Sequence, residues 1–568
     1  MKNNIEGVPE RILVTRLIGY FRPYLGQCVV LAIVVIISLG ATLLQPILWS
    51  KLLAALFAKN IEGLSKILFG VIILYLVTVG VGFVQSVITS YLNAHVICSM
   101  QNQLFEKMLS MNMSYFDKNQ TGAFIARIIT DISQVIDTVT KQIVPAFINL
   151  IKVVVIFFIM IRINVILTFI TVGLLPITLF VYSHNTKKMR EKQTDVKQSN
   201  DKIVSMLQQT VSGIKSIKTL GIKNVESKLF DDSNQNKTQK VFHFALFVVV
   251  FQTVLSLIGM LGEVSVYVVG GYFVLQSIIT VERFIQFASY SQQFGNSSLS
   301  LVNLVADYQK VLVSLRRLYD IEDTANKYHE EFGTQVLSGG EGEIDICDMT
   351  YSYDREEVLK SVYINIPANE VTAIIGESGS GKTTLLDLIL GVYSGNSGEI
   401  KINGCLIENI SEQSLRNYVA IVSQQHFLFN ASVFENFKYV NKDITLETVQ
   451  KICRECQMHT MIENLPDKYN TVIYENGNNF SIGQLQRLNI ARALAKNAQI
   501  ILFDEPTSAL DATSTEKIKQ IINKLRCHKT IVIVSHDMRF IENADKIYKI
   551  ANGTATQIQE GDKHYGRN

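Results

Sequence analysis

The sequence predicts two domains of different fold classes: an α-helical transmembrane domain with six spans, and an α/β domain that follows it. Of the 568 residues, 48% are hydrophobic and only 18% are charged, whereas a soluble domain carries about 25% charged residues. The mean hydropathy is +0.22, and the apolar excess lies almost wholly before residue 320. Beyond residue 340, short runs of Val and Ile alternate with helical stretches, which indicates an α/β fold.

Changes of composition along the chain predict four segments. Residues 1–22 form an amphipathic helix at the cytoplasmic face, because charges interrupt a mildly apolar stretch. Residues 23–321 form the transmembrane domain with two intracellular loops. The polar, Gly-containing residues 322–340 form a linker, and residues 341–568 form the α/β domain.

The charge balance excludes several classes of protein. Lys and Arg number 53 against 50 Asp and Glu, and the net charge of +3 is too small to bind nucleic acid by counterion release, so we expect no nucleic-acid partner. The high hydrophobic content excludes intrinsic disorder. The seven cysteines are scattered and odd in number, which is typical of reduced cytosolic thiols rather than of a disulfide framework.

Tracts without charged residues predict the first four spans. No Asp, Glu, Lys or Arg occurs in residues 23–50 or 67–105, and each tract exceeds the roughly 20 residues that cross a bilayer core. The third span is predicted from about Gln142 to Ile161 and the fourth from about Asn164 to Val181. Arg162 and Ile163 are expected to form a tight turn between them.

The number and bounds of the last spans are harder to predict. Residues Val241 to Thr280 carry a single charge, Glu263, and their length suits either two spans or one long helix. We expect one long fifth helix from Val241 to about Gln276, and a sixth span within Glu282 to Arg316. Basic residues in the loops after the second and fourth spans place both loops in the cytoplasm. The bilayer is therefore a partner, and the even number of spans puts the α/β domain in the cytoplasm.

A phosphate-binding loop is predicted where an apolar strand meets a helix. Residues Gly376 to Thr383 read GESGSGKT, a spacing in which glycines let backbone N–H groups surround phosphate oxygens and the next helix points its positive end at them. Lys382 is expected to reach the β- and γ-phosphates of ATP, and Thr383 to ligate Mg²⁺. The predicted ATP contacts in this region are Gly376, Glu377, Ser378, Gly379, Ser380, Gly381, Lys382, Thr383 and Thr384.

Two further strands carry candidate catalytic residues. QIILFDEP is a buried strand that delivers Asp504 and Glu505 to its polar end. We expect Asp504 to bind ATP through Mg²⁺ and Glu505 to polarise the attacking water as general base. TIVIVSHD brings His536 to the same sheet edge, where its imidazole could contact the γ-phosphate.

The segment NNFSIGQLQRLNIARAL resembles the signature helix of the ATP-binding cassette (ABC) transporters, and the six-span half resembles their type I exporter fold. The resemblance covers residues from about 10 to about 555. It implies that Tyr353 stacks on adenine, and that Gln424 touches Mg²⁺ and senses the membrane domain. It also implies that Glu475 meets the opposing subunit and that Ser508–Asp511 form the D-loop.

The resemblance further implies that this chain is half of a transporter and must dimerise. Each ATP would lie between one subunit's phosphate-binding loop and the partner's signature, where Ser481, Gly483 and Gln484 would contact it. The segments Tyr115–Asp131 and Val211–Gly221 are similar to those that form and flank the two coupling helices, which would transmit closure of the cassettes to the spans.

The signature departs from the family at one position. It reads FSIGQ, so Ile482 stands where the family usually has Gly. One interpretation is a tolerated variant in a homodimer, and the other is a heterodimer with a second half-transporter and one weakened ATP site. We favour the homodimer because Glu505 and His536 are both intact.

Residues within the spans are candidates for the translocation pathway. Lys152 and Glu263 lie near the middle of the third and fifth spans, where a charge costs about 2.5–3.5 kcal/mol or more. They either line the pathway or form a structural ion pair. The polar residues of the sixth span, among them Gln292 and Asn296, predict an uncharged cavity for an amphipathic cargo, although interhelical hydrogen bonds use the same residue types. The polar residues of this span are Gln286, Ser289, Gln292, Gln293, Asn296, Ser297 and Asn303.

One motif suggests a different metal site. In CRECQMH, Cys453, Cys456 and His459 have a spacing that can bind zinc. No second pair follows at finger spacing, so we expect an ordinary helix here.

These observations predict an exporter half-transporter in a cell membrane, which we expect to be a bacterial plasma membrane. It would use ATP and Mg²⁺ to move a small amphipathic compound or peptide out of the cytoplasm by alternating access. The alternatives are a lipid flippase, an exporter-shaped siderophore importer, and an ATP-gated channel or regulatory subunit. Glu505 and His536 argue against the last, because a sensor needs no water-activating carboxylate.

Overall fold

The computed structural model describes residues 9–57, 61–118, 124–125, 127–302, 304–337, 339–353, 356–424, 427–474, 479–506, 512–526, 528–535 and 543–558. The chain divides into two compact units. The first contains Met1–Leu109 and Thr121–Ala325, and the second contains Ser110–Gln120 and Asn326–Asn568. The first unit is helical and the second has an α/β fold.

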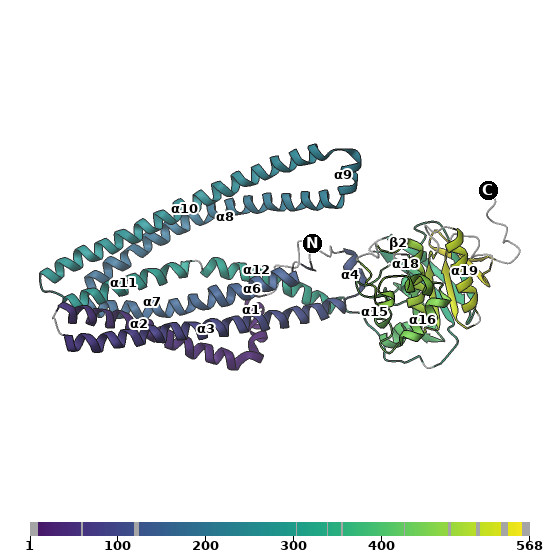
Figure 1. The fold of residues 1–568 in the computed structure, drawn as a ribbon, viewed down its shortest axis with the longest axis horizontal. Coiled ribbons are helices and arrows are strands. Elements are labelled where there is room, and N and C mark those ends of the chain that lie inside the picture. Colours follow the sequence, from purple (N-terminus) through teal and green to yellow (C-terminus); the bar gives the residue numbers. More distant parts are fainter. Residues whose placement is uncertain are drawn as a thin grey trace. The chain divides into compact units, whose positions relative to one another are not determined.

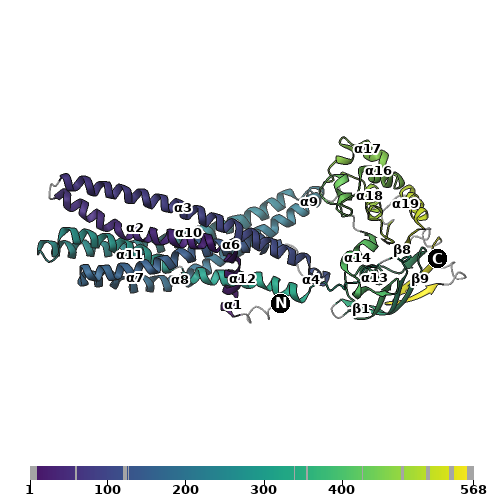
Figure 2. The same ribbon diagram turned by 90° about the horizontal axis from the view of Figure 1, so that it is seen from below.

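Long helices build the first unit. Their packing pairs α2 with α3, α7 with α11, and α8 with α10. Figures 1 and 2 show α8 and α10 side by side, with α9 joining them at their far end. The helices are α1 (Glu10–Phe21), η1 (Arg22–Tyr24), α2 (Leu25–Phe57), α3 (Ile61–Leu109), η2 (Arg127–Asp131), α6 (Ile132–Thr138), η3 (Val139–Ile143), α7 (Val144–Ile163), α8 (Val165–Ser212), α9 (Ile214–Leu220), α10 (Lys223–Leu275), α11 (Val281–Val302) and α12 (Leu304–Lys327).

Among the described residues, five helical stretches are long and apolar enough to cross a membrane, and they include α2, α3, α7, α8 and α10. The prediction of one unbroken fifth helix is confirmed by α10, which has 53 residues, but the helix begins at Lys223 and not at the predicted Val241. A continuous helix satisfies every backbone group inside a bilayer. The predicted sixth span falls on α11, which is not among these five stretches. Its 22 residues reach about 33 Å at 1.5 Å per residue.

Two predicted boundaries differ from the structure. Arg162 and Ile163 belong to α7, and the turn is a single extended residue, Asn164, whose side chain accepts a hydrogen bond from the backbone N–H of Leu167 at 3.0 Å. The turn was misplaced because the charge of Arg162 marks the end of the apolar tract and not the end of the helix. Likewise, α12 continues to Lys327, so the polar composition after Ile321 marks the last turns of a helix before any linker.

The core of the first unit contains aromatic residues of α11. Phe287 and Tyr290 are fully buried against Ile156 of α7 and Leu167 of α8. The Tyr290 hydroxyl donates to the backbone carbonyl of Leu43 at 2.6 Å. The polar helix α11 is therefore held among its apolar neighbours by one buried face.

The second unit contains two sheets. A four-stranded antiparallel sheet has the order β2-β1-β4-β5, and a six-stranded sheet has the order β10-β9-β3-β8-β7-β6. The strands from β9 to β6 are parallel, and β10 is antiparallel to β9. The strands are β1 (Ile344–Tyr353), β2 (Glu356–Ile366), β3 (Val371–Ile375), β4 (Ser397–Ile402), β5 (Cys405–Leu406), β6 (Val419–Val422), β7 (Ile500–Asp504), β8 (Thr530–Val534), β9 (Lys546–Ala551) and β10 (Thr554–Ile558).

Helices cover both faces of the six-stranded sheet. Phe503 and Ile533 join one hydrophobic core, whereas their neighbours Leu502 and Val532 join the other. This double burial explains why these strands are continuous apolar runs. The helices are α4 (Met113–Lys118), α13 (Lys382–Ile389), η4 (Ile407–Asn409), α14 (Glu412–Tyr418), α15 (Val433–Lys438), α16 (Leu446–Glu455), α17 (His459–Glu463), η5 (Lys468–Asn470), α18 (Ile482–Ala495) and α19 (Ala512–Leu525).

The cysteines of the CRECQMH motif belong to this core. Cys453 and Cys456 are fully buried, and burial raises the pKa of the Cys453 thiol to about 12. His459 shares a hydrogen bond with the hydroxyl of Tyr469 at 2.9 Å. The two cysteines therefore pack in the hydrophobic core.

Candidate functional site

The phosphate-binding loop joins β3 to α13 through a backbone that requires glycine. Gly379 and Gly381 have φ values of +82° and +101°, which L side chains rarely adopt. A Cβ atom on Gly376 would collide with the backbone oxygen of Ile550 and with the hydroxyl of Ser380. The loop therefore needs glycine at these three positions to adopt this backbone.

Polar groups of the loop fit a triphosphate. The first turn of α13 has no side-chain cap, so its N–H groups remain available to an anion. The Ser380 hydroxyl is buried without a hydrogen-bond partner. Lys382 is 5% exposed, and its ammonium donates to the carbonyls of Gly376 and Glu377 at 2.9 and 2.7 Å, which holds it over the loop.

The strand order brings the predicted motifs together. In the six-stranded sheet, β8 lies between β3 and β7, so the carboxyl ends of all three parallel strands share one edge. There the Thr383 hydroxyl donates to the two Asp504 carboxylate oxygens at 3.3 and 3.1 Å. Burial raises the pKa of Asp504, and the negative charge of Glu505 adds to this effect, while the bond from Thr383 opposes it.

Glu505 is held in a fixed orientation. Its φ value is +47°, a backbone conformation that costs a non-glycine residue about 1–3 kcal/mol. Its backbone N–H donates to the carbonyl of Val534 at 2.9 Å. Its carboxylate accepts a hydrogen bond from the Gln424 side-chain amide at 2.7 Å. The structure thus joins the predicted general base directly to the predicted sensor of the membrane domain.

Tyr353 is part of an aromatic cluster, which we define as Tyr351, Tyr353 and Tyr393. The Tyr353 ring lies 4.9 Å from Tyr351 and 5.5 Å from Tyr393, both in edge-to-face geometry. Its hydroxyl lies 3.3 Å from the hydroxyl of Thr384, next to the phosphate-binding loop. Its ring remains partly exposed, as adenine stacking requires.

The aromatic cluster contacts α4, a connection that the sequence did not reveal. The Tyr393 hydroxyl donates to the Asp117 carboxylate at 2.7 Å, and Asp117 lies in the segment predicted to form a coupling helix. Nearby, burial together with the charges of Asp504 and Asp117 raises the pKa of Asp387 to about 6. Tyr393 and Asp387 carry no recognisable motif, and only the fold brings them here.

The signature residues begin α18. Ser481 caps this helix: its hydroxyl accepts from the Gln484 backbone N–H at 3.3 Å, and the Gln484 side chain accepts from the Ser481 N–H at 2.8 Å. Ile482, at the first helical position, is 54% exposed, and Gly483 is half-buried beside it. His536, Glu475 and Ser508–Asp511 lie outside the described residues.

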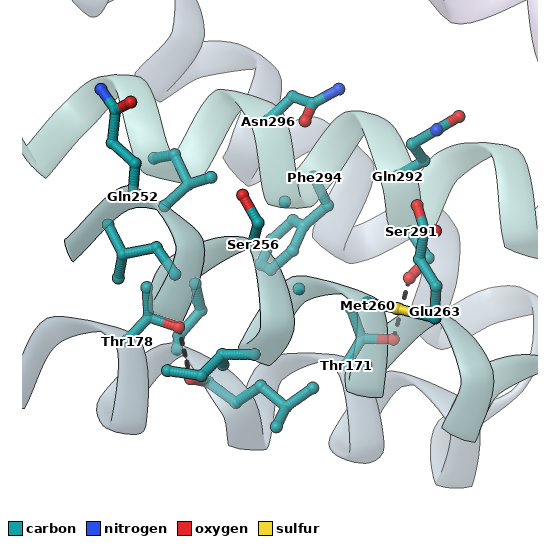
Figure 3. Close-up of a pocket in the computed structure, with 18 residues that line it drawn as sticks. Thr171, Thr178, Gln252, Ser256, Met260, Glu263, Ser291, Gln292, Phe294 and Asn296 are labelled. Atoms are coloured by element: carbon teal, nitrogen blue, oxygen red, sulfur yellow. Dashed lines mark hydrogen bonds between the residues drawn. The ribbon is translucent and has the colours of Figure 1, made fainter. Parts of the chain in front are cut away.

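A cavity of about 580 Å³ lies in the first unit between α8, α10 and α11. We call it the membrane cavity. Figure 3 shows Gln252 and Glu263 at its opposite ends, with Gln292 on the side of Glu263. It is lined by Thr171, Leu174, Leu175, Thr178, Gln252, Leu255, Ser256, Ile258, Gly259, Met260, Gly262, Glu263, Ser291, Gln292, Phe294, Gly295, Asn296 and Leu299.

The predicted pathway residues separate into two groups. Glu263, Gln292 and Asn296 line the membrane cavity, whereas Lys152, on α7, does not. Within the described part of the chain, no ion pair joins Lys152 to Glu263. Sequence reasoning missed Gln252 and Ser256, although they share one face of a helix with Glu263 at helical spacing.

Some polar residues of α11 make interhelical contacts, whereas the Ser289 hydroxyl donates to the Ile285 carbonyl of its own helix at 3.0 Å. The Gln293 amide donates to the backbone carbonyl of Thr42 at 3.4 Å. Asn149 donates to the Ser300 hydroxyl at 2.8 Å, and the hydroxyls of Thr171 and Ser291 lie 3.2 Å apart. Asn303 lies outside the described residues. Both interpretations of this polar helix are therefore realised, and Ser291 both lines the membrane cavity and contacts α8.

A bundle of membrane-crossing helices fused to a phosphate-binding α/β unit with a signature helix defines a membrane transporter that hydrolyses ATP. Family models for the ABC transporter transmembrane region and the ABC transporter match residues 28–298 and 359–508. The chain belongs to the ABC transporter family and is a half-transporter, a multi-pass membrane protein that binds ATP.

Curated relatives extend over nearly the whole chain. An ATP-dependent lipid A-core flippase of Syntrophus aciditrophicus is 28% identical over 98% of this chain and 92% of its own length. A protein of the same name from Vibrio cholerae is 27% identical over 97% of this chain and 94% of its own length. A putative multidrug export ATP-binding/permease protein of Bacillus subtilis, YgaD, is 25% identical over 96% of both chains.

Proposed function

We propose that this chain is one half of an ATP-driven exporter that pairs with a second copy and moves an amphipathic compound or peptide out of the cytoplasm by alternating access. The observation that carries the proposal is the sheet edge where Lys382, Thr383, Asp504 and Glu505 meet, in a chain whose membrane helices line a largely uncharged cavity. The first provides a site for ATP hydrolysis, and the second provides a site for cargo.

The residues at this edge suit Mg²⁺ as well as ATP. Hydroxyl and carboxylate oxygens are the ligands that Mg²⁺ prefers, and those of Thr383 and Asp504 already lie 3.1 Å apart. Gln424 lies close enough to contact Glu505 and would complete the metal site. The metal would neutralise phosphate charge. Glu505 would accept a proton from the attacking water, in an orientation that Gln424 maintains.

The N-terminus of α18 supports the homodimer. The cap uses the Ser481 oxygen as an acceptor, which leaves its O–H hydrogen for a phosphate of the partner's ATP. Ile482 is mostly exposed and fits α18 without disturbing the core. This placement supports the interpretation of Ile482 as a tolerated variant over a heterodimer with a weakened site.

The helix α4 could couple ATP hydrolysis in the second unit to the membrane helices. The helix α4 follows α3 in sequence, yet it belongs to the second unit. Asn112, just before α4, donates its backbone N–H to the carbonyl of Tyr328 at 2.7 Å, and Asp117 binds Tyr393. A movement of the second unit would therefore displace the chain between α3 and α6.

A lipid flippase is the second candidate, because several relatives are named ATP-dependent lipid A-core flippases. Both candidates place the chain in a bacterial plasma membrane. Liposomes that carry the purified chain with its ATP-binding domains outside distinguish them. We expect ATP to drive an amphipathic dye into the lumen, and Glu505→Gln to abolish this uptake. Flipping of a labelled phospholipid without dye uptake would select the flippase, and hydrolysis without movement of dye, peptide or lipid would contradict transport.

A further inference from the structure

We propose that the membrane cavity is a binding site for a cationic amphiphile, whose positive group is held by the carboxylate of Glu263. This inference rests on the proposed function and narrows its cargo: it selects a cation over an anionic, phosphate-bearing lipid. It also assigns Glu263 a role in binding cargo. The sequence alone allowed either this role or a structural ion pair with Lys152.

Charge is the first argument. Glu263 is the charged residue among the residues that line the membrane cavity, and none of the described lining residues is Lys, Arg or His. In the described part of the chain Glu263 forms no ion pair. A carboxylate within a membrane span is costly and faces a cavity or a partner, and here a cavity is present without a cationic side chain. A bound cation would supply the missing opposite charge.

The polarity of the walls is the second argument. Gln252 and Ser256 on α10, and Gln292 and Asn296 on α11, offer amide and hydroxyl groups to the cavity, while Leu174 and Phe294 offer apolar surface. Such mixed walls suit a ligand with both polar and apolar parts. An anionic headgroup would meet repulsion from Glu263 and no compensating basic side chain.

The dimensions agree with a small ligand. The volume of about 580 Å³ lies within the range of about 300–1,000 Å³ that is typical of pockets for drug-sized molecules. Gln252 and Glu263 lie about 16 Å apart along α10, at 1.5 Å per residue. The carboxylate thus stands at one end of an elongated pocket, so it would orient the ligand as well as attract it.

Glu263 has no packing role in the protomer that competes with this proposal. Its side chain is exposed, whereas its neighbour Gly262 makes the close contact between α10 and Leu174 of α8. The change Glu263→Gln keeps the size of the side chain and removes only its charge. It therefore tests binding without creating a cavity or a clash.

Two probe ions of matched size and shape test the charge preference. Tetraphenylphosphonium is a cation and tetraphenylborate is an anion. Equilibrium dialysis without ATP would measure the affinity of each for the full-length dimer in nanodiscs, with binding to empty nanodiscs subtracted. We expect the wild-type protein to bind the cation at least about tenfold more tightly than the anion, equivalent to about 1.4 kcal/mol.

Substitutions then test whether the preference for the cation depends on the carboxylate of Glu263. We expect Glu263→Gln to weaken cation binding about tenfold and to leave anion binding no weaker, while Glu263→Asp retains the preference. The matched control is Glu282→Gln, the same change on α11 at a residue that does not line the cavity, and it should leave the affinity ratio unchanged.

The outcomes separate this inference from the proposed function. Equal or stronger anion binding by the wild-type protein overturns the inference, whatever the variants do, and so does a Glu263→Gln variant that keeps the cation preference. If the cation binds as expected but ATP drives no uptake of any amphiphile into liposomes, then the proposed function fails and the cation site stands. If ATP drives uptake of the anion alone, transport stands and the cation site fails.

Discussion

A substitution of Glu505 tests directly whether its carboxylate is the general base in ATP hydrolysis. Glu505→Gln keeps a side chain that can meet Gln424 but cannot accept a proton from water. We expect the rate of ATP hydrolysis to fall by about 100-fold or more, while ATP binding survives because the phosphate-binding loop is untouched. Phosphate release and retention of labelled ATP measure the two quantities. A variant that hydrolyses ATP at the parental rate would show that Glu505 is not the base.

Tyr393 offers a test of coupling at the residue scale. Tyr393→Phe keeps the ring contacts with Tyr351 and Tyr353 but removes the hydrogen bond to Asp117, and a bond to a charged group contributes about 1.5–3 kcal/mol. We expect cargo to lose most of its stimulation of ATP hydrolysis, while hydrolysis without cargo persists. The control is Asp117→Asn, whose amide oxygen still accepts the bond and should retain stimulation. Full stimulation in Tyr393→Phe would contradict this role.

The sequence predicted some residues of the candidate site but not others. Residues 376–383 act through spacing within one short loop, so the pattern alone identifies them. Asp504 and Glu505 lie at the end of an apolar strand, and this local pattern was enough to predict them. Tyr393 and Asp117 lie 276 positions apart, and their contact depends on how α4 packs. No local pattern encodes it.

At the scale of elements, a glycine sets the distance between α8 and α10. A Cβ atom on Gly262 would lie 2.5 Å from the Cδ1 atom of Leu174. We expect Gly262→Ala to destabilise the protein by about 1–3 kcal/mol and to cost less in a Leu174→Ala background, where the clash is relieved. Thermal unfolding of the solubilised protein measures both effects.

A nearby glycine on the same helix is the control. A Cβ atom on Gly259 would meet nothing within 4 Å, so Gly259→Ala should leave the melting temperature unchanged or raise it, since Ala favours a helix over Gly by about 1 kcal/mol. Equal losses from Gly259→Ala and Gly262→Ala would mean that the close approach of α10 to Leu174 is not the cause.

Element boundaries were harder to predict than elements. One long helix was the expectation for α10 because the apolar tract after Val241 has no proline and a bilayer does not tolerate a break in the backbone, although its length also suits two spans. The turn at Asn164 and the end of α12 were not, because the chain changes composition a few residues before or after it changes conformation. Charged residues can extend a helix beyond the membrane as readily as they can end it.

At the scale of the molecule, one chain has one phosphate-binding loop and one signature. We expect each ATP site to combine the loop of one copy with the signature of the other. The phosphate-binding loop contributes Lys382 and the start of α18 contributes Ser481. If the site forms across a homodimer, a chain with Lys382→Ala and a chain with Ser481→Ala combine into one doubly damaged site and one intact site. Either variant alone damages both sites.

We therefore expect mixed dimers of Lys382→Ala and Ser481→Ala chains, purified through two different tags, to hydrolyse ATP about tenfold or more faster than either variant alone. The matched control pairs a wild-type chain with a chain that carries both changes. This dimer has the same composition, but each of its sites has one lesion, so it should stay inactive. Phosphate release measures all four proteins. Equal rates in the two mixed dimers would contradict a site shared between subunits, whereas activity in the first alone would also show that Ile482 supports hydrolysis in a homodimer.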